Sequence, residues 1–232
     1  MLNASQLIVK IVAENSEIAF INLFRPRMSP PIQNEGGLSL AELDLIENAL
    51  RLRSSISLPF WDCLLLRMSN SPADAPVLLK TAQRHNPQSV SSEKLSRRDV
   101  RQDVLDSKIS KLGAGTVLAV SSRIECHNGK VMHLPLLDFH CGASSKNDLL
   151  VRSLVQNLNL HGYIAHSGRS YHFYGSHLVD DQNLMMILAR ALLFAPIIDR
   201  AWIAHQLIEG ACGLRISPGK EYSHGPIVID QT

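Results

Sequence analysis

The sequence predicts an α+β fold, with a split β-α-β-β-α-β unit in the second half of the chain and an α/β portion in the first half. Short β-rich runs alternate with helical patterns from residue 115 onward. The 232 residues, of which 45% are apolar and 19% are charged, have the composition of an ordinary globular protein. We therefore divide the chain into residues 1–114 and 115–232, which also fit one compact unit.

Net charge and cysteine usage restrict the class of protein. The formal net charge of +2 is too small to indicate nucleic-acid binding by itself. Four scattered cysteines, without a secretory apolar segment or an apolar run of membrane-spanning length, indicate a reducing compartment. We expect a cytoplasmic protein that does not contact a membrane.

The first half starts with two apolar runs in "QLIVKIVAENSEIAFINLF", which predict two strands, or a strand joined to a helix. The Pro- and Gly-rich "RPRMSPPIQNEGG" predicts a loop. A helix follows in "LSLAELDLIENALRLRS", with Ser39 as its N-cap. "LPFWDCLLLRMS" predicts a short core helix with Pro59 in its first turn.

A polar stretch then leads to the second half, and its last part predicts a solvated helix that ends at Gly113. Its basic residues could meet a phosphate backbone, although mixed charge on a helix more often reflects solvation. The hairpin signal Asn-Gly in "HNGK" comes next, because a type I′ turn needs positive φ at both central residues. It predicts that Val117–Cys126 pairs with Val131–His140.

The remaining elements complete the β-α-β-β-α-β order. "SKNDLLVRSLVQNLN" predicts a helix, "HGYIAHSG" and "RSYHFYGS" two strands, and "DDQNLMMILARALLFAP" a helix that Pro196 stops. An extra helix, "DRAWIAHQLIEG", ends at Gly210 and leads to the strand "CGLRIS". This order is typical of a ferredoxin-like antiparallel sheet with helices on one side and a free face for a ligand or another chain. The first of these helices is expected to turn four leucines inward: Leu149, Leu150, Leu154 and Leu158.

Two polar pairs stand out on neighbouring predicted strands. Side chains two residues apart on a strand point the same way, so Asp138 pairs with His140 and Ser170 with His172. Asp199 follows the apolar "II" as a third polar position. Taken singly, each has a simpler explanation: Asp138 at a solvated sheet edge, His172 as a core histidine, and Asp199 as a helix N-cap. Their shared sheet makes a ligand site the more informative hypothesis.

The order of these motifs resembles that of the archaeo-eukaryotic primase and primase-polymerase superfamily. The resemblance lies in "LLDFH", "SYH" and "IID", followed by "GLRIS", and covers about residues 115–227. It implies a primase-like core that binds a nucleoside triphosphate and nucleic acid and transfers a nucleotidyl group to a 3′-hydroxyl. It also implies a place in replication, mobile elements or anti-phage defence, as a subunit among protein partners.

The resemblance further implies the roles of individual residues. Asp138 and Asp199 would be catalytic acids that hold a divalent cation, Mn²⁺ or Mg²⁺. Ser170, His172 and Arg215 would contact the nucleotide in a shallow site on the sheet.

This chain departs from the family pattern at His140, which stands where a second acid is usual and is therefore the third candidate catalytic and metal residue. Neutral imidazole suits Mn²⁺ or Zn²⁺ better than Mg²⁺. The substitution favours a one-metal or manganese enzyme, or a protein that binds nucleotide without synthesis. The alternative is a catalytically inactive protein-interaction module on the same fold.

Overall fold

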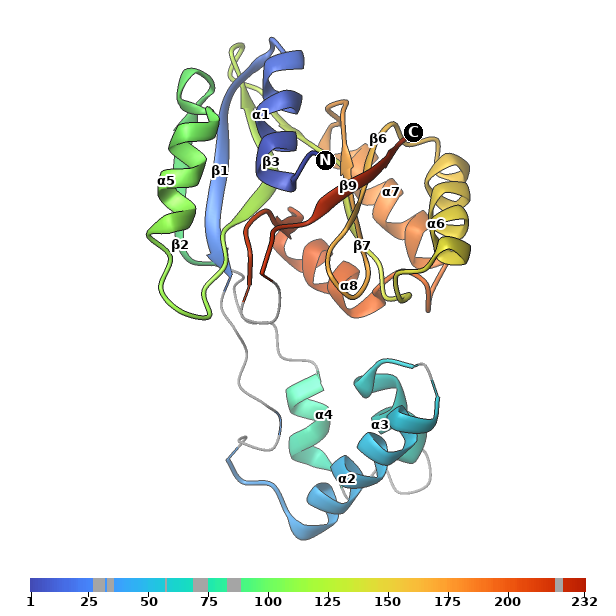
Figure 1. The fold of residues 1–232 in the computed structure, drawn as a ribbon. Helices are drawn as coiled ribbons and strands as arrows, with labels where there is room; N and C mark the ends of the chain where they lie inside the picture. The colour runs from blue at the N-terminus through green and yellow to red at the C-terminus, as the bar shows by residue number, and fades with distance from the viewer. Residues whose placement is uncertain (27–31, 33–35, 57, 69–74, 83–88, 220–222) are drawn as a thin grey trace. The chain divides into compact units, whose positions relative to one another are not determined.

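The computed structural model describes residues 1–26, 32, 36–56, 58–68, 75–82, 89–219 and 223–232, and it is an α+β structure (Figure 1). In these ranges, no helix combines the length and the apolar character needed to cross a membrane. The elements are α1 (Ala4–Glu14), β1 (Ile18–Pro26), α2 (Leu40–Ser55), α3 (Phe60–Met68), α4 (Pro76–Ala82), β2 (Ser89–Ser96), η3 (Arg97–Asp99), α5 (Gln102–Ser110), β3 (Ala119–Cys126), β4 (Val131–His133), β5 (Leu136–Asp138), α6 (Ser145–Asn157), β6 (Gly162–His166), β7 (Tyr171–Gly175), α7 (Asp181–Leu192), α8 (Arg200–Glu209), β8 (Gly213–Arg215) and β9 (Ile227–Gln231).

The chain forms two compact units. The larger unit joins Met1–Arg27 to Pro87–Thr232, and the smaller unit, Met28–Asn86, is inserted between β1 and β2. The division predicted from the sequence at residue 114 stays a prediction. The predicted "RPRMSPPIQNEGG" loop lies largely outside the described residues.

The smaller unit consists of α2, α3 and α4 around its own apolar core. Ser39 caps α2 as predicted, in a capping box with Glu42. The Glu42 carboxylate also accepts hydrogen bonds from the main-chain N–H groups of Val77 and Leu78, at 2.8 and 3.1 Å. One buried carboxylate therefore caps two helices, α2 and α4. The core helix predicted after Pro59 is α3.

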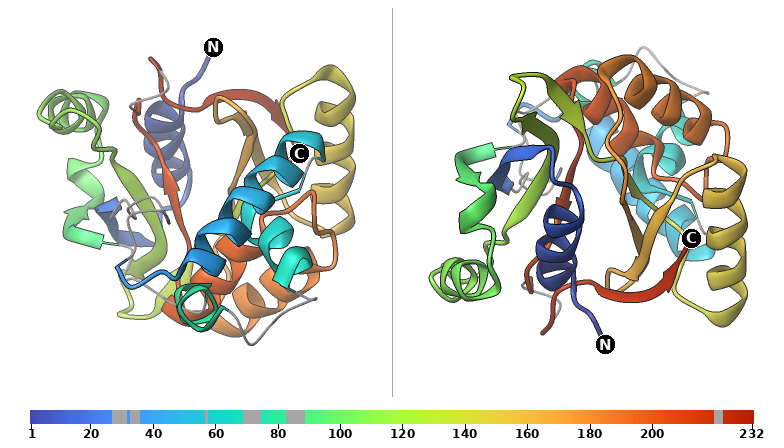
Figure 2. Two further views of the ribbon diagram at one scale, coloured as in Figure 1. Left: turned by 90° about the horizontal axis from the view of Figure 1, so that it is seen from below. Right: turned by 90° about the horizontal axis from the view of Figure 1, so that it is seen from above.

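The first sheet of the larger unit has the strand order β2-β1-β3-β4, with β8 also paired to β3. The N-terminal apolar runs form the helix α1 and the strand β1. The strand β2 was not predicted, because "SVSSEKLS" lacks the apolar alternation of a half-buried strand. It is held by antiparallel pairing along β1, from Phe20 to Pro26. Figure 2 shows α1 between this sheet and the second one.

The second sheet has the antiparallel order β5-β7-β6-β9. The order β5-β7-β6 is that of the predicted ferredoxin-like unit. The fourth strand of that unit, β8, instead pairs with β3 in the first sheet. The α+β class and the primase-like element order are therefore confirmed, while the elements are divided between two sheets.

The predicted hairpin is confirmed only in its first half. β3 pairs with β4, but of the Asn-Gly pair only Gly129 has a positive φ, of 78°, so the turn is not of the predicted type I′. The predicted second strand, Val131–His140, is interrupted by Pro135, which has no main-chain N–H for a ladder. The chain then enters the second sheet as β5, so the prediction of one continuous strand was wrong.

The buried face of α6 differs from the predicted one. Leu149 and Leu150 are 65% and 40% exposed, whereas Leu154 and Leu158 are buried as predicted. The other buried positions of this helix, Val151 and Val155, shift the apolar stripe by about one residue. The two helices that follow, α7 and α8, end before Pro196 and at Gly210 as predicted.

Candidate functional site

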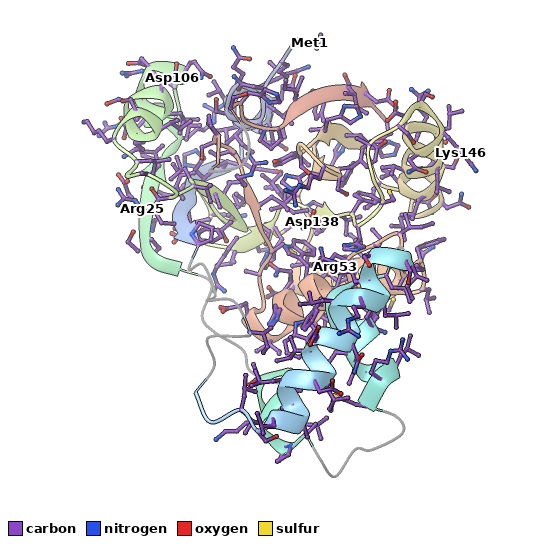
Figure 3. All side chains as sticks on the ribbon, turned by 60° about the horizontal axis from the view of Figure 1, so that its bottom comes forward. Met1, Arg25, Arg53, Asp106, Asp138 and Lys146 are labelled. Atoms are coloured by element: carbon purple, nitrogen blue, oxygen red, sulfur yellow. The ribbon has the colours of Figure 1, made fainter. Side chains whose placement is uncertain are left out.

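The strands β5 and β7 place Asp138 directly opposite His172. Both side chains point to the same face, and Asp138 Oδ1 lies 3.6 Å from His172 Nε2. The Asp138 side chain is 28% exposed and that of His172 only 9%. Figure 3 shows Asp138 between the ends of the larger unit that Asp106 and Lys146 mark. The two side chains therefore lie on one face, as the alternation along the strands predicts, while their roles in a shallow nucleotide site stay a prediction.

The face of the second sheet that carries Asp138 and His172 is covered by a strand of the first sheet. The opposite face carries Tyr171, whose hydroxyl donates to Asp148 of α6 at 2.6 Å. The face of Asp138 and His172 turns instead toward β8 of the first sheet, where the Tyr174 hydroxyl donates to the Arg215 carbonyl at 2.6 Å. The candidate site therefore lies between the two sheets, with Asp138 as its more exposed side chain.

Asp199 lies beside Asp138 through main-chain contacts. Phe139 and Ile198 form an isolated antiparallel bridge, and the Asp199 N–H donates to the Asp138 carbonyl at 3.1 Å. The Asp199 carboxylate accepts a hydrogen bond from the Trp202 N–H at 3.0 Å and so caps α8. The simpler explanation of Asp199, helix capping, is therefore confirmed, and the same residue also adds negative charge next to Asp138.

Arg215 comes to the site from β8. Its guanidinium donates to the Ser217 and Ser167 carbonyls, both at 2.5 Å. Ser167 lies in the turn between β6 and β7, so this contact ties that turn to β8. The positive charge of Arg215 acts on both Asp138 and His172.

Ser170 immediately precedes β7, and its hydroxyl donates to the Phe139 carbonyl at 2.5 Å. This bond uses the only hydroxyl proton, so the Ser170 oxygen is left as an acceptor. His140 follows the end of β5, and its main-chain N–H donates to the Ile197 carbonyl at 2.7 Å. Across the described ranges, no three His, Cys, Asp or Glu side chains are grouped to hold a metal ion. The metal set of Asp138, His140 and Asp199 therefore stays a prediction.

The electrostatics of the site favour uncharged side chains. Burial, and then the negative charge of Asp199, raises the pKa of Asp138 to about 8, against the opposing effect of Arg215. Burial, and then the charge of Arg215, lowers the pKa of His172 to about 3. Near neutral pH, His172 is therefore an uncharged imidazole beside a carboxyl group that retains its proton. Such perturbed pairs are typical of functional sites.

Tyr174 lies beside His172 and was not among the predicted site residues. Its hydroxyl lies 3.0 Å from His172 Nδ1 in addition to its contact with Arg215. Together with Tyr171 and Phe173 it is fully buried, so these aromatic rings pack in the core. The signal available in the sequence was its position two residues after His172, on the same face of the strand.

A second group of hydrogen-bonded polar side chains in the larger unit has a structural role. Ser122 Oγ lies 3.0 Å from His133 Nδ1, and His133 Nε2 lies 2.7 Å from Asp181 Oδ1. This resembles a Ser-His-Asp arrangement, but Ser122 and His133 are both completely buried. Ser122 also accepts a hydrogen bond from the Cys212 N–H at 2.8 Å. These hydrogen bonds therefore satisfy buried polar groups where β3, β4 and α7 meet.

A family model described as AEP-like, archaeo-eukaryotic primase 1D-like, matches residues 96–226, which is more than half of the chain. The chain belongs to this family. The match includes all six predicted site residues, and it excludes α1, β1 and β9. No curated protein and no solved structure matches the chain. Membership in the archaeo-eukaryotic primase 1D-like family confirms the resemblance inferred from the motif order.

Proposed function

We propose that the chain binds a nucleoside triphosphate between its two sheets and transfers the nucleotidyl group to the 3′-hydroxyl of a nucleic acid. The observation that carries the proposal is the pairing of Asp138 with His172 on one face, 3.6 Å apart. In the transfer, a bond forms between the 3′-oxygen and the α-phosphorus, pyrophosphate leaves, and the hydroxyl proton passes to solvent.

The acid pair fits a divalent cation. Two carboxyl groups, Asp138 and Asp199, lie close enough for the charge of one to raise the pKa of the other. A divalent cation relieves that repulsion and favours the ionised form of both groups. Mg²⁺ and Mn²⁺ are often bound by one or two carboxylates together with substrate phosphates and water, so two acids are a sufficient protein contribution. When bound, the cation would neutralise charge on the reacting phosphates.

The other residues would bind the phosphates. Arg215 supplies positive charge from β8, the strand toward which the face of Asp138 turns, and its guanidinium donates to two main-chain carbonyls. A guanidinium that is oriented in advance loses little entropy when it binds an anion. His172 lies 3.6 Å from Asp138 and feels the charge of Arg215, and it would line the bound nucleotide.

The test of binding is thermal stability in the presence of Mn²⁺ and a nucleoside triphosphate. A ligand present at 100 times its Kd stabilises the native state by about 2.7 kcal/mol. We expect Tm to rise for the wild type and to stay constant for Asp138→Asn. The matched control is Asp148→Asn, because Asp148 also pairs with a histidine, His166, but on the opposite face of the sheet. This control should keep the wild-type rise in Tm.

The test of transfer is extension of a labelled primer, with Mn²⁺ and Mg²⁺ compared. We expect extension by the wild type and by Asp148→Asn, and its loss in Asp138→Asn. If millimolar nucleotide and Mn²⁺ leave the Tm of the wild type unchanged, the nucleotide site is refuted and the interaction module is favoured. A rise in Tm without extension would refute transfer and leave binding intact.

A further inference from the structure

The Tyr174 hydroxyl has two close polar neighbours. It lies 2.6 Å from the Arg215 carbonyl oxygen and 3.0 Å from His172 Nδ1. Both distances are within the range of good hydrogen bonds. Tyr174 is fully buried and His172 nearly so, which leaves little room for water to replace either partner. The protons on these groups must therefore be arranged so that both contacts are attractive.

Only one arrangement of protons satisfies this condition. A carbonyl oxygen only accepts, so the single proton of the Tyr174 hydroxyl is directed at the Arg215 carbonyl. If that proton pointed at His172 instead, two oxygens would face each other at 2.6 Å without a proton between them. The Tyr174 oxygen therefore accepts, and Nδ1 of His172 must carry the proton that it accepts.

We propose that Tyr174 is a positioning residue that holds His172 in its Nδ1-protonated tautomer and turns Nε2 toward Asp138. The ring of His172 has two nitrogens, and free imidazole exchanges its proton between them. Tyr174 removes this freedom because its oxygen is a fixed acceptor on one side of the ring. Nε2 is then the nitrogen presented to a ligand, 3.6 Å from Asp138 Oδ1.

The same hydroxyl connects the two sheets. Tyr174 belongs to β7 of the second sheet, and the carbonyl it bonds belongs to β8 of the first. The orientation of the His172 ring is therefore set by a strand that is not its neighbour in its own sheet. This connection places the histidine motif and the Arg215 motif in a fixed relationship.

The test is the tautomer of His172, measured by long-range ¹H–¹⁵N correlation on protein with ¹⁵N-labelled histidine. The signals of His172 are assigned from their loss in His172→Gln. In the wild type we expect a protonated Nδ1, and in Tyr174→Phe a shift of the proton to Nε2 or a mixture of tautomers. A wild-type spectrum with the proton on Nε2, or an unchanged His172 signal in Tyr174→Phe, would overturn the proposal.

Tyr171→Phe is the matched control for the loss of a buried hydroxyl. Its hydroxyl also makes close hydrogen bonds, to Asp148 and to Ser144, but on the other face of β7. We expect this variant to keep the His172 tautomer. If both variants change the His172 signal equally, the effect is a general loosening of the strand and the positioning role is wrong.

The expected effect of the tautomer on ligand binding rests on the proposed function, and it is tested by a separate affinity measurement. We expect Tyr174→Phe to weaken binding of the nucleotide and Mn²⁺ by about tenfold, the lower end of the scale found when a partner that orients a metal-ligating histidine is lost. Unchanged affinity would refute the functional part of the proposal. If the wild type binds no nucleotide, the proposed function fails, whereas the tautomer measurement still decides the role of Tyr174.

Discussion

The main chains of Asp138 and Asp199 run side by side, joined by the hydrogen bond from the Asp199 N–H to the Asp138 carbonyl. Two acids that are 61 positions apart in the sequence are thereby brought to one edge of the second sheet. The contact also gives Asp199 two duties, because its carboxylate caps α8 while its charge raises the pKa of Asp138. These duties can be separated by substitution.

Asp199→Asn should preserve the cap and remove the charge, because asparagine is as good an N-cap as aspartate. We expect the free energy of unfolding to change little and the pKa of Asp138 to fall from about 8, toward the value that burial alone sets. Asp199→Ala should lower the same pKa and also cost about 1 kcal/mol through the lost cap. Carboxyl ¹³C titration and urea unfolding measure the two quantities. Equal stability losses in both variants would contradict this separation.

Asp138 should make the wild type less stable as pH rises from about 4 to about 8. Its folded pKa is raised to about 8, so over this range the native state keeps a proton that the unfolded state has released. Asp138→Asn has no carboxyl group at this position and so lacks this pH dependence. The free energy of unfolding of the variant, relative to that of the wild type, should therefore increase with pH. His172 acts in the opposite sense, between its lowered pKa of about 3 and about 6.5, but in both proteins. Urea unfolding at pH 5, 6.5 and 8 tests this, and parallel curves would refute it.

Gly162→Ala should destabilise the second sheet by about 3 kcal/mol, because the new methyl group overpacks a close main-chain contact. A Cβ at this position would lie 2.2 Å from the Tyr174 carbonyl oxygen and 2.7 Å from Gly175 Cα. The matched control is Gly113→Ala, where the nearest atom would be the Thr116 hydroxyl at 3.9 Å. We expect this control to stay within about 0.5 kcal/mol of the wild type. Urea unfolding measures both losses. Equal free energies of unfolding for the two variants would contradict the prediction, because the close main-chain contact at Gly162 would then tolerate a methyl group.

Glu42→Ala should destabilise the smaller unit by about 2 kcal/mol or more, because it leaves the buried N–H of Leu78 and the N–H of Val77 without an acceptor. Glu47→Ala on the same helix removes only an exposed pair with Arg51 and should change little. The protein has two tryptophans, and Trp61 packs against the core of this unit. Its fluorescence, in a background in which Trp202 is phenylalanine, reports the unfolding. Equal losses in the two variants would refute the double cap.

Local patterns made much of the site predictable. Asp138 and His172 were expected on one face because side chains alternate along a strand and the two strands were expected to be neighbours. Asp199 as an N-cap and Gly210 as a helix end followed from short-range rules as well. These inferences need only a few consecutive residues, and the fold confirms them.

The partners of strands depend on contacts that local patterns do not contain. β8 was placed in one sheet with the histidine strand, but it pairs with β3 of the other sheet. Tyr174 could not be given its role for the same reason, since the carbonyl that fixes its hydroxyl belongs to β8. The polar strand β2 was missed because its order comes from pairing with β1 and not from its own apolar residues.

The inserted helical unit leaves the larger unit immediately after β1 and returns to it at β2, the antiparallel neighbour of β1. Pro26 is the register partner of Ser89, so the whole insertion occupies the position of a hairpin turn. The 59 residues of the smaller unit, Met28–Asn86, are therefore a separable module, in the way that long insertions are tolerated elsewhere. Excision of the module, with a tight turn in its place, would produce a minimal protein in which the two-sheet scaffold and its acids are retained.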